Sequence, residues 1–236
     1  IVGRAFDADA NEVDSGSMQV AYLPVENSLA GELTTDTTLR GAWLLEDIVT
    51  VPSETVLTVE PGTFVFMGQG ASLVVEGRLL ARGTQAEPIH FTHYGEGTTW
   101  KQVLFVEAAD SRLDHCIVEY ADSEGEHQDY YESGPRDYHE AIVVLACHLD
   151  VNDCTFQKLP DGGKDAEGDA LAVISDDPNH PGEATASIRG CEFLRIGQGV
   201  HTRYSYVLVE DCFFTGKRGD NDDVDLWGES TPAPLV

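Results

Sequence analysis

The chain has 236 residues, 42 of them Asp or Glu against 14 Lys or Arg, so its formal net charge is -28, and 42% of its residues are hydrophobic. A chain of this length and apolar content can bury a core, so we expect one folded domain or two. The acidic field excludes nucleic acids and anionic lipids as partners, because their phosphates require clustered Lys and Arg. No apolar run reaches the roughly 18 residues of a membrane span, so no membrane insertion is expected. Cations are the natural partners, and the composition favours a secreted or cell-surface location.

The chain changes texture along its length. Residues 1–30 are acidic, small and polar with weak alternation, which predicts an N-terminal cap or linker. From Trp43 onward, short runs rich in Val, Leu, Thr and Phe alternate with Gly and Pro, which is typical of strands joined by turns. Residues 31–228 therefore form the predicted all-β domain. Residues 229–236 include two prolines and read as a linker-like tail.

A repeat appears when the chain is aligned on its cysteines. Four segments share an aliphatic residue, two polar or small residues, Cys, any residue, and then Val or Phe: 113–118, 151–156, 188–193 and 209–214. Repeats 20 to 50 residues long indicate solenoids, whose units bury their apolar faces by stacking on one another. We predict a parallel β-solenoid with two interior ladders. One ladder consists of small, reduced thiols, and the other of larger side chains two residues further on: Cys116, Cys154, Cys191 and Cys212; Val118, Phe156, Phe193 and Phe214.

The segment from residue 31 to 92 resembles the opening of bacterial secreted right-handed parallel β-helix proteins of the pectate-lyase-like class. The resemblance is carried by Leu57-Thr58-Val59-Glu60-Pro61-Gly62-Thr63, by the run 73–84 and by Pro88-Ile89-His90-Phe91-Thr92. The chain departs from that pattern at Trp100-Lys101-Gln102-Val103, where relatives carry W-G-G-I. The resemblance implies a right-handed β-helix and a secreted or cell-surface protein. It implies little about chemistry, although polysaccharide enzymes of this fold place their catalytic residues on an outer face.

Acidic residues recur where the chain enters one strand of each repeat. Aligned in this register, Glu140, Asp169, Gln198 and Asp222 form a predicted column. Stacked acids repel one another unless they protonate or share a cation, and hard oxygen ligands favour calcium. The run 219–225 is the densest acidic segment but lacks the Gly and Glu of an EF-hand loop. The predicted Ca²⁺ ligands are Asp220, Asp222, Asp223, Asp225, Glu140 and Asp169; the alternative is that these acids are ordinary solvated surface groups.

The insertion 121–140 is too long for a turn and carries seven acids and three tyrosines. Tyr130, Tyr131 and Tyr138, together with Trp227, are candidate platforms for sugar rings, with a self-packed insertion as the alternative.

Near the C-terminus, strand alternation predicts that the outer face becomes polar. His201 and Arg203 are expected to lie beside Asp223 and Asp225 of the next coil, a set able to perform acid/base catalysis or to hold an acidic sugar. The signature motifs of polygalacturonases are missing from the sequence. The alternative is a polar surface that meets a partner domain.

Three functions remain open. The leading hypothesis is a non-catalytic extracellular β-helix module, an acidic scaffold for surface attachment or carbohydrate contact that binds calcium. The first alternative is a polysaccharide lyase or glycoside hydrolase acting on the outer face. The second is a structural subunit of a larger extracellular assembly, since the last coil exposes a sheet edge unless another domain or subunit covers it.

Overall fold

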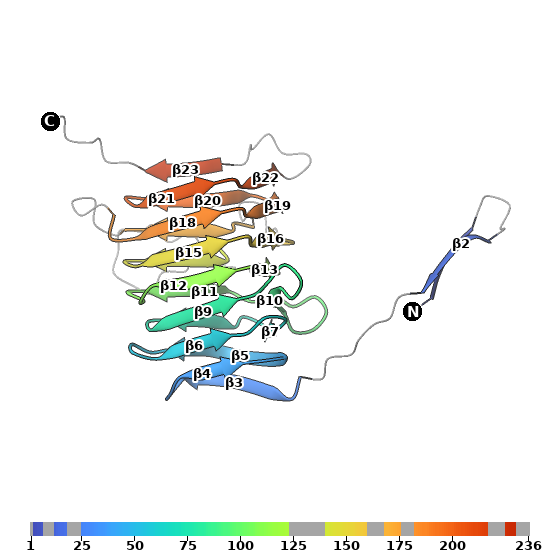
Figure 1. Ribbon diagram of the computed structural model, residues 1–236, viewed down its shortest axis with the longest axis horizontal. Helices are drawn as coiled ribbons and strands as arrows, with labels where there is room; N and C mark the ends of the chain where they lie inside the picture. The colour runs from blue at the N-terminus through green and yellow to red at the C-terminus, as the bar shows by residue number, and fades with distance from the viewer. Residues whose placement is uncertain are drawn as a thin grey trace.

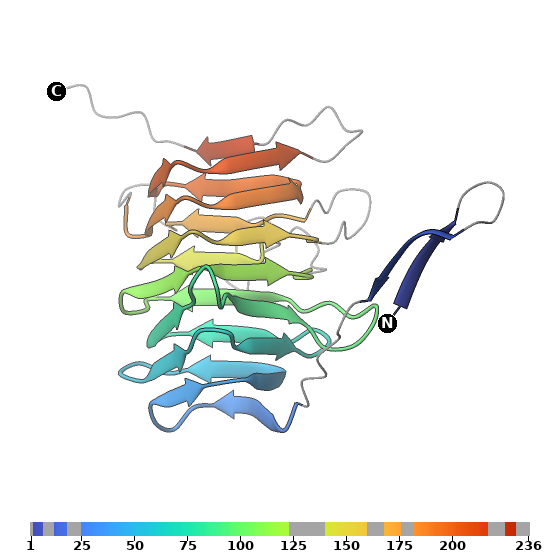
Figure 2. The same cartoon turned by 45° about the vertical axis from the view of Figure 1, so that its right-hand side comes forward.

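A computed structural model describes residues 2–6, 12–17, 25–122, 140–159, 168–175, 182–216 and 225–229, with the backbone alone at 2–6, 12–17, 198, 216 and 225–229. Every regular element in these ranges is a β-strand, and they contain no helix long and apolar enough to cross a membrane. The strands stack coil upon coil from β3 at one end to β23 at the other (Figures 1 and 2). The all-β parallel solenoid is therefore confirmed.

Each coil contributes one strand to each of three faces, on which all neighbouring strands run parallel. The first face consists of β7 (Phe64–Met67), β10 (Ile89–His93), β13 (Cys116–Glu119), β16 (Thr155–Gln157), β19 (Glu192–Ile196) and β22 (Phe213–Gly216). The second face consists of β8 (Ser72–Val75), β11 (Gln102–Val106), β14 (Ile142–Leu145), β17 (Leu171–Ile174), β20 (Gln198–Arg203) and β23 (Asp225–Glu229). The third face consists of β4 (Thr37–Leu39), β6 (Val56–Val59), β9 (Arg78–Arg82), β12 (Ser111–Asp114), β15 (His148–Asn152), β18 (Thr185–Arg189) and β21 (Tyr206–Glu210).

The chain visits the third, first and second faces in turn and rises by one strand spacing per coil. In Figure 1 the third-face strands run to the right in front and the second-face strands return to the left behind them as the coils rise from β3 to β23, which is the path of a right-handed solenoid. The long strand β5 (Ala42–Val51) crosses from the first face to the second, pairing with β7 and then with β8. Strand β3 (Asn27–Glu32) pairs with β5, so the first solenoid strand begins four residues before residue 31. Strands β1 (Val2–Phe6) and β2 (Glu12–Ser17) form a separate antiparallel hairpin.

The cysteine ladder is confirmed by the strand register. Ile117 pairs with Thr155, Thr155 with Glu192, and Glu192 with Phe213, which stacks the four repeat cysteines in adjacent coils. All are free thiols, three of them fully buried, whereas Cys147 lies outside this column. Two residues further on, the rings of Phe156, Phe193 and Phe214 stack with centroids 4.9 and 4.5 Å apart. The thiols occupy one interior position in successive coils, and the aromatic rings occupy another. Because side chains of the same size stack at each position, the interior is filled while the coils keep the same size.

The corner before each ladder cysteine has a left-handed backbone. His115, Asp153, Gly190 and Asp211 all have φ between 46° and 62°. Asp, His and Gly are among the residues that adopt this conformation most readily. At position 190 a Cβ would lie 2.5 Å from Asp153 Oδ1, so a larger residue there would require this exposed side chain to move. This corner turns the chain from the third face onto the first.

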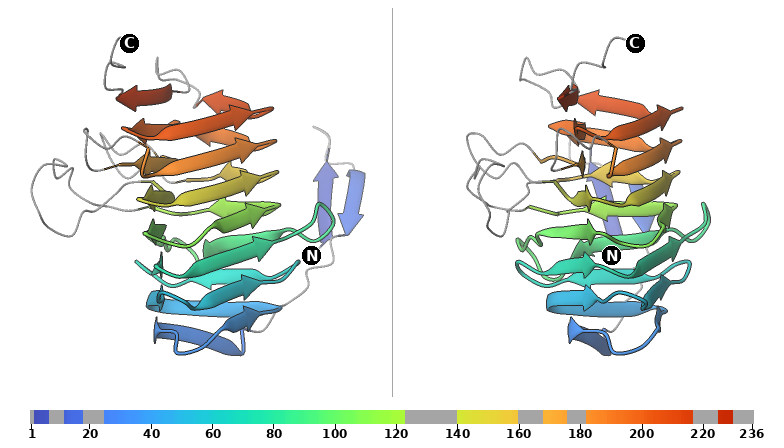
Figure 3. Two further views of the ribbon diagram at one scale, coloured as in Figure 1. Left: turned by 60° about the vertical axis from the view of Figure 1, so that its left-hand side comes forward. Right: turned by 90° about the vertical axis from the view of Figure 1, so that its left-hand side faces the viewer.

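Charged residues form an outward column along the third face. The register stacks seven positions in order from the N-terminal to the C-terminal coil: Arg40, Glu60, Arg82, Asp114, Asn152, Arg189 and Glu210. Arg40 contacts Glu60 at 2.5 Å, Asn152 donates to Asp114 at 3.1 Å, and Arg189 donates to Glu210 at 2.8 Å. Like charges never occupy adjacent coils in this column, which we call the charge ladder. Figure 3 shows the strands of successive coils stacked above one another in two further views.

Candidate functional site

The second face contains a buried pair formed by Glu140 and His201. His201 Nδ1 donates to Glu140 Oε1 across 2.9 Å, and the two side chains are 12% and 4% exposed respectively. A carboxylate only accepts hydrogen bonds, so the contact places a ring proton on Nδ1 of His201. This pairing is the arrangement in which a carboxylate orients an imidazole for proton transfer.

The pair spans three coils. His201 on β20 pairs with Ala172 on β17, and Ala172 pairs with Val143 on β14, three residues after Glu140. Ala172 is fully buried, and its methyl group is small enough for the imidazole and the carboxylate to meet beside it. Sequence reasoning placed Glu140 among metal ligands and His201 among catalytic residues. The structure brings the two together.

Two further polar residues are buried on this part of the second face. Arg203 is 7% exposed, and its guanidinium carbon lies 5.4 Å from the centroid of the Tyr204 ring. Gln102 lies one coil before Glu140, since Val103 pairs with Ile142. Within the described residues, Gln102 Oε1 and Glu140 Oε2 are buried acceptors without a hydrogen-bond partner. Such acceptors carry a desolvation cost that a bound donor would relieve.

An aliphatic cluster lies on one side of the pair. Val143, Ala172 and Ile174 are buried on the outward side and pack with Leu104 and Leu145 in a cluster separate from the main core. The outer face thus changes from aliphatic to charged between β17 and β20, as the alternation predicted. A low-polarity boundary strengthens the interaction between Glu140 and His201.

The last coil is in a different register from the one expected. Val200 pairs with Leu226 rather than with Val224, so the backbone register pairs His201 with Trp227 and Arg203 with Glu229. Asp225 pairs with Gln198, the position expected for Asp222. The acidic run offers several equivalent Asp residues, and a bulge between Gln198 and Val200 shifts their alignment. Asp225 is therefore not the neighbour of His201, and the sequence reasoning overlooked Glu229.

Most of the predicted ligand and metal residues lie outside the described residues: Asp220, Asp222, Asp223, Tyr130, Tyr131 and Tyr138. Asp225 and Trp227 are placed by their backbone alone, and Asp169 is half-buried at the entry to β17. In the parts of the chain that the structure describes, no three His, Cys, Asp or Glu side chains converge as metal ligands. Calcium binding therefore stays a prediction.

The first face holds a carboxylate that sequence reasoning missed. Glu119 accepts hydrogen bonds from Thr92 Oγ1 at 3.0 Å, Gln157 Nε2 at 3.2 Å and Lys158 Nζ at 2.8 Å. The hydrogen bond to Glu119 raises the pKa of Lys158. This cluster ties three adjacent coils together, and no sequence motif marks it, because its members are single polar residues on separate strands.

Aromatic rings lie beside this cluster. Phe64 and His90 stack with centroids 4.3 Å apart and planes 4° apart, and Tyr94 meets Phe66 edge to face. Burial lowers the pKa of His90, while Glu119 acts to raise it and Lys158 to lower it. The stacking of Phe64 on His90 joins two adjacent coils on this face.

A scan against protein-family models finds no match, and searches of the curated proteins and of the solved structures find none either. The resemblance to secreted pectate-lyase-like β-helix proteins therefore stays a prediction that rests on the residues quoted for it.

Proposed function

We propose that the protein is a non-catalytic extracellular β-helix module, an acidic and rigid scaffold for surface attachment or carbohydrate contact. The observation that carries the proposal is the charge ladder, which joins neighbouring coils on the outside as the cysteine and phenylalanine ladders do on the inside. Charged side chains that bond one coil to the next resist bending of the solenoid and make it a stiff rod. A stiff rod with a formal charge of -28 suits the display of acidic surface to cations and neutral glycans.

Calcium is part of this proposal, with Asp220, Asp222, Asp223 and Asp225 as the ligands that the acidic run supplies. The test is a thermal melt of the protein stripped with EDTA and then titrated with Ca²⁺ or, as a control, Mg²⁺. We expect Ca²⁺ to raise Tm through preferential binding to the folded state, and the Asp220→Asn/Asp222→Asn variant to lose the response. A Tm that is indifferent to EDTA and Ca²⁺ contradicts calcium binding.

Carbohydrate contact is tested on a panel of neutral and acidic polysaccharides by affinity electrophoresis. We expect retardation in neutral glycan gels and none in acidic ones, because the protein's own charge repels the latter. If no glycan changes the migration of the protein, the carbohydrate part of the proposal is wrong, and only the surface-attachment part remains.

A second candidate function is an acid/base enzyme acting on polysaccharide at the second face, and the buried Glu140–His201 contact favours it. In this function His201 exchanges the proton, Glu140 orients the ring, and Arg203 neutralises acid on the substrate. The test is turnover of the same polysaccharide panel by the wild-type protein and by the His201→Ala, Glu140→Gln and Glu119→Gln variants. Turnover that requires His201 and Glu140 but not Glu119 supports the enzyme and overturns the non-catalytic proposal; turnover that survives His201→Ala contradicts this site.

A further inference from the structure

The C-terminal end of the third face presents an open strand edge. Strand β21 is the last strand of that sheet, and none of the described strands pairs with its outer edge. Tyr206 N donates to Ala184 O, and Gly190 N donates to Glu210 O, so the residues of β21 that bond to β18 are 206, 208 and 210. By the alternation of a parallel ladder, the N–H and C=O groups of Val207 and Val209 point to the outer edge.

The path of the chain makes this edge the next position of the solenoid. Strands β20 and β17, both on the second face, are each followed by a third-face strand, β21 and β18. Strand β23 also lies on the second face, so the place that follows it is the third face beside β21. Pro232 and Pro234 have no amide hydrogen to donate to an adjacent strand.

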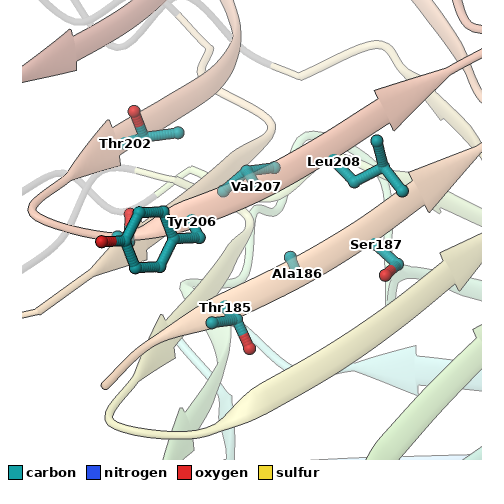
Figure 4. A pocket seen from close by; sticks show the side chains of 8 residues that line it. Thr185, Ala186, Ser187, Thr202, Tyr206, Val207 and Leu208 are labelled. Atoms are coloured by element: carbon teal, nitrogen blue, oxygen red, sulfur yellow. The ribbon is translucent and has the colours of Figure 1, made fainter. Parts of the chain in front are cut away.

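Side chains at the edge define what would fit beside it. Val207 and Val209 face inward but are only half-buried against the core, whereas Val151 and Ile188, which precede Val209 in the same column, are fully buried. Outward, Tyr206 is 66% and Leu208 42% exposed. A hollow of about 530 Å³ lies beside β21 and its paired neighbour β18, lined by Tyr206, Val207 and Leu208 of β21 and by Thr185, Ala186 and Ser187 of β18 (Figure 4). A strand with apolar residues facing the two valines would complete the core here.

The charge ladder ends at this edge on an acid. Glu210 has Arg189 on one side, while the described residues supply no cation on the other. Continuing the alternation requires a basic residue opposite Glu210. A second copy of this chain is a poor occupant, because two chains of formal charge -28 repel each other.

We propose that the outer edge of β21 binds an extended strand of another polypeptide. The strand adds parallel to β21, with apolar residues facing Val207 and Val209 and a basic residue facing Glu210. Main-chain hydrogen bonds provide affinity in this mode of recognition, and alternate side chains provide specificity.

The probe is a synthetic peptide of residues 182–190 of this chain, Gly-Glu-Ala-Thr-Ala-Ser-Ile-Arg-Gly, the pattern that already pairs with β21 on its other side. Binding is measured by fluorescence anisotropy, and amide exchange of β21 by NMR or mass spectrometry. We expect the peptide to slow exchange at Val207 and Val209 by at least tenfold and to leave Leu208, which β18 already protects, unchanged.

Matched variants separate strand pairing from other binding. In the proposed register the peptide donates through the nitrogens of Ser187 and Arg189, so N-methylation there should abolish binding, whereas N-methylation at Ala186 and Ile188 should be tolerated. In the protein, Val207→Pro removes an edge donor that β18 does not use, and it should weaken binding by more than tenfold. Glu210→Gln should weaken it by about two- to fivefold, as expected for an exposed ion pair.

Four results would overturn the proposal. The first is that the amides of Val207 and Val209 are already protected in the protein alone, at every protein concentration; this result means that the chain itself fills the edge. Protection that grows with protein concentration together with a dimer in analytical ultracentrifugation means that a second copy fills it. Absence of peptide binding to an exchange-competent edge, or binding that ignores the N-methyl pattern, contradicts strand addition directly.

Discussion

Glu119 on the first face and Glu140 on the second face are both largely buried carboxylates, but they are satisfied differently. Glu119 has three side-chain donors from the two adjacent coils, including the cation of Lys158, and both its oxygens are used. Glu140 has one described donor, His201, and its Oε2 has no partner within the described residues. The difference teaches that two buried carboxylates can be satisfied to different extents: the neighbours of Glu119 use both of its oxygens and join coils, whereas Glu140 Oε2 has no partner among the described residues.

The largest expected effect comes from removing Glu140. Glu140→Ala leaves His201 buried without the carboxylate that accepts its Nδ1 hydrogen, and we expect the free energy of unfolding to fall by about 3 kcal/mol. Urea denaturation at pH 7 measures it. The isosteric Glu140→Gln keeps an acceptor for His201 Nδ1 and should recover about half of the loss. Equal stability of wild type and Glu140→Ala would show that the contact with His201 contributes nothing.

Glu119→Ala should cost less, about 1 to 2 kcal/mol, because two of its donors, Gln157 and Lys158, are partly exposed and can bond to water instead. The same urea titration compares the two alanine variants side by side. The reverse order, with Glu119→Ala the more damaging, would mean that saturated contacts between coils outweigh the buried pair.

The pH dependence of stability offers a smaller and more specific comparison. Burial lowers the pKa of His90, so below the ordinary value near 6.5 the unfolded state binds more protons than the folded state. This contribution to stability is complete above that pH and is lost as the pH falls through the range below it.

We expect His90→Phe, which extends the ring stack from Phe64, to flatten the curve between pH 7 and 5. Glu119→Gln should make the stability fall more steeply with decreasing pH. Glu119 acts to raise the pKa of His90, so removing its charge lowers that pKa further. Melting curves across this pH range provide the measurement. If Tm falls equally steeply with pH for wild type and His90→Phe, another group governs the loss of stability between pH 7 and 5.

The smallest effect is expected at the charge ladder. Arg189 and Glu210 are about half exposed, so their pair should contribute less than about 1 kcal/mol and weaken in high salt. A double-mutant cycle with Arg189→Ala and Glu210→Ala at 0.05 and 1 M NaCl isolates the coupling. A coupling energy of 2 kcal/mol or more would place the ladder among the main determinants of stability, beside the Glu140–His201 contact.

The interior of the fold could be predicted from the sequence because it repeats. Cys116, Cys154 and Cys191 recur with a Val or Phe two residues later, and a parallel register turns such recurrence directly into a column. The contact between Glu140 and His201 has no such signal. It joins different residue types two coils apart and depends on the small side chain of Ala172 between them. In the last coil the register failed for a related reason, since an acidic run with several Asp residues can be aligned in more than one way.

The alternating charges of the third face also govern how the solenoid could be lengthened or shortened. Excising the coil that carries Arg82 would place Glu60 directly against Asp114, and excising the coil of Glu60 would place Arg40 against Arg82. Excising the coil of Asn152, the neutral position, would instead bring Asp114 opposite Arg189. Asn152 therefore marks a joint at which a whole coil can be removed while opposite charges still meet across the seam.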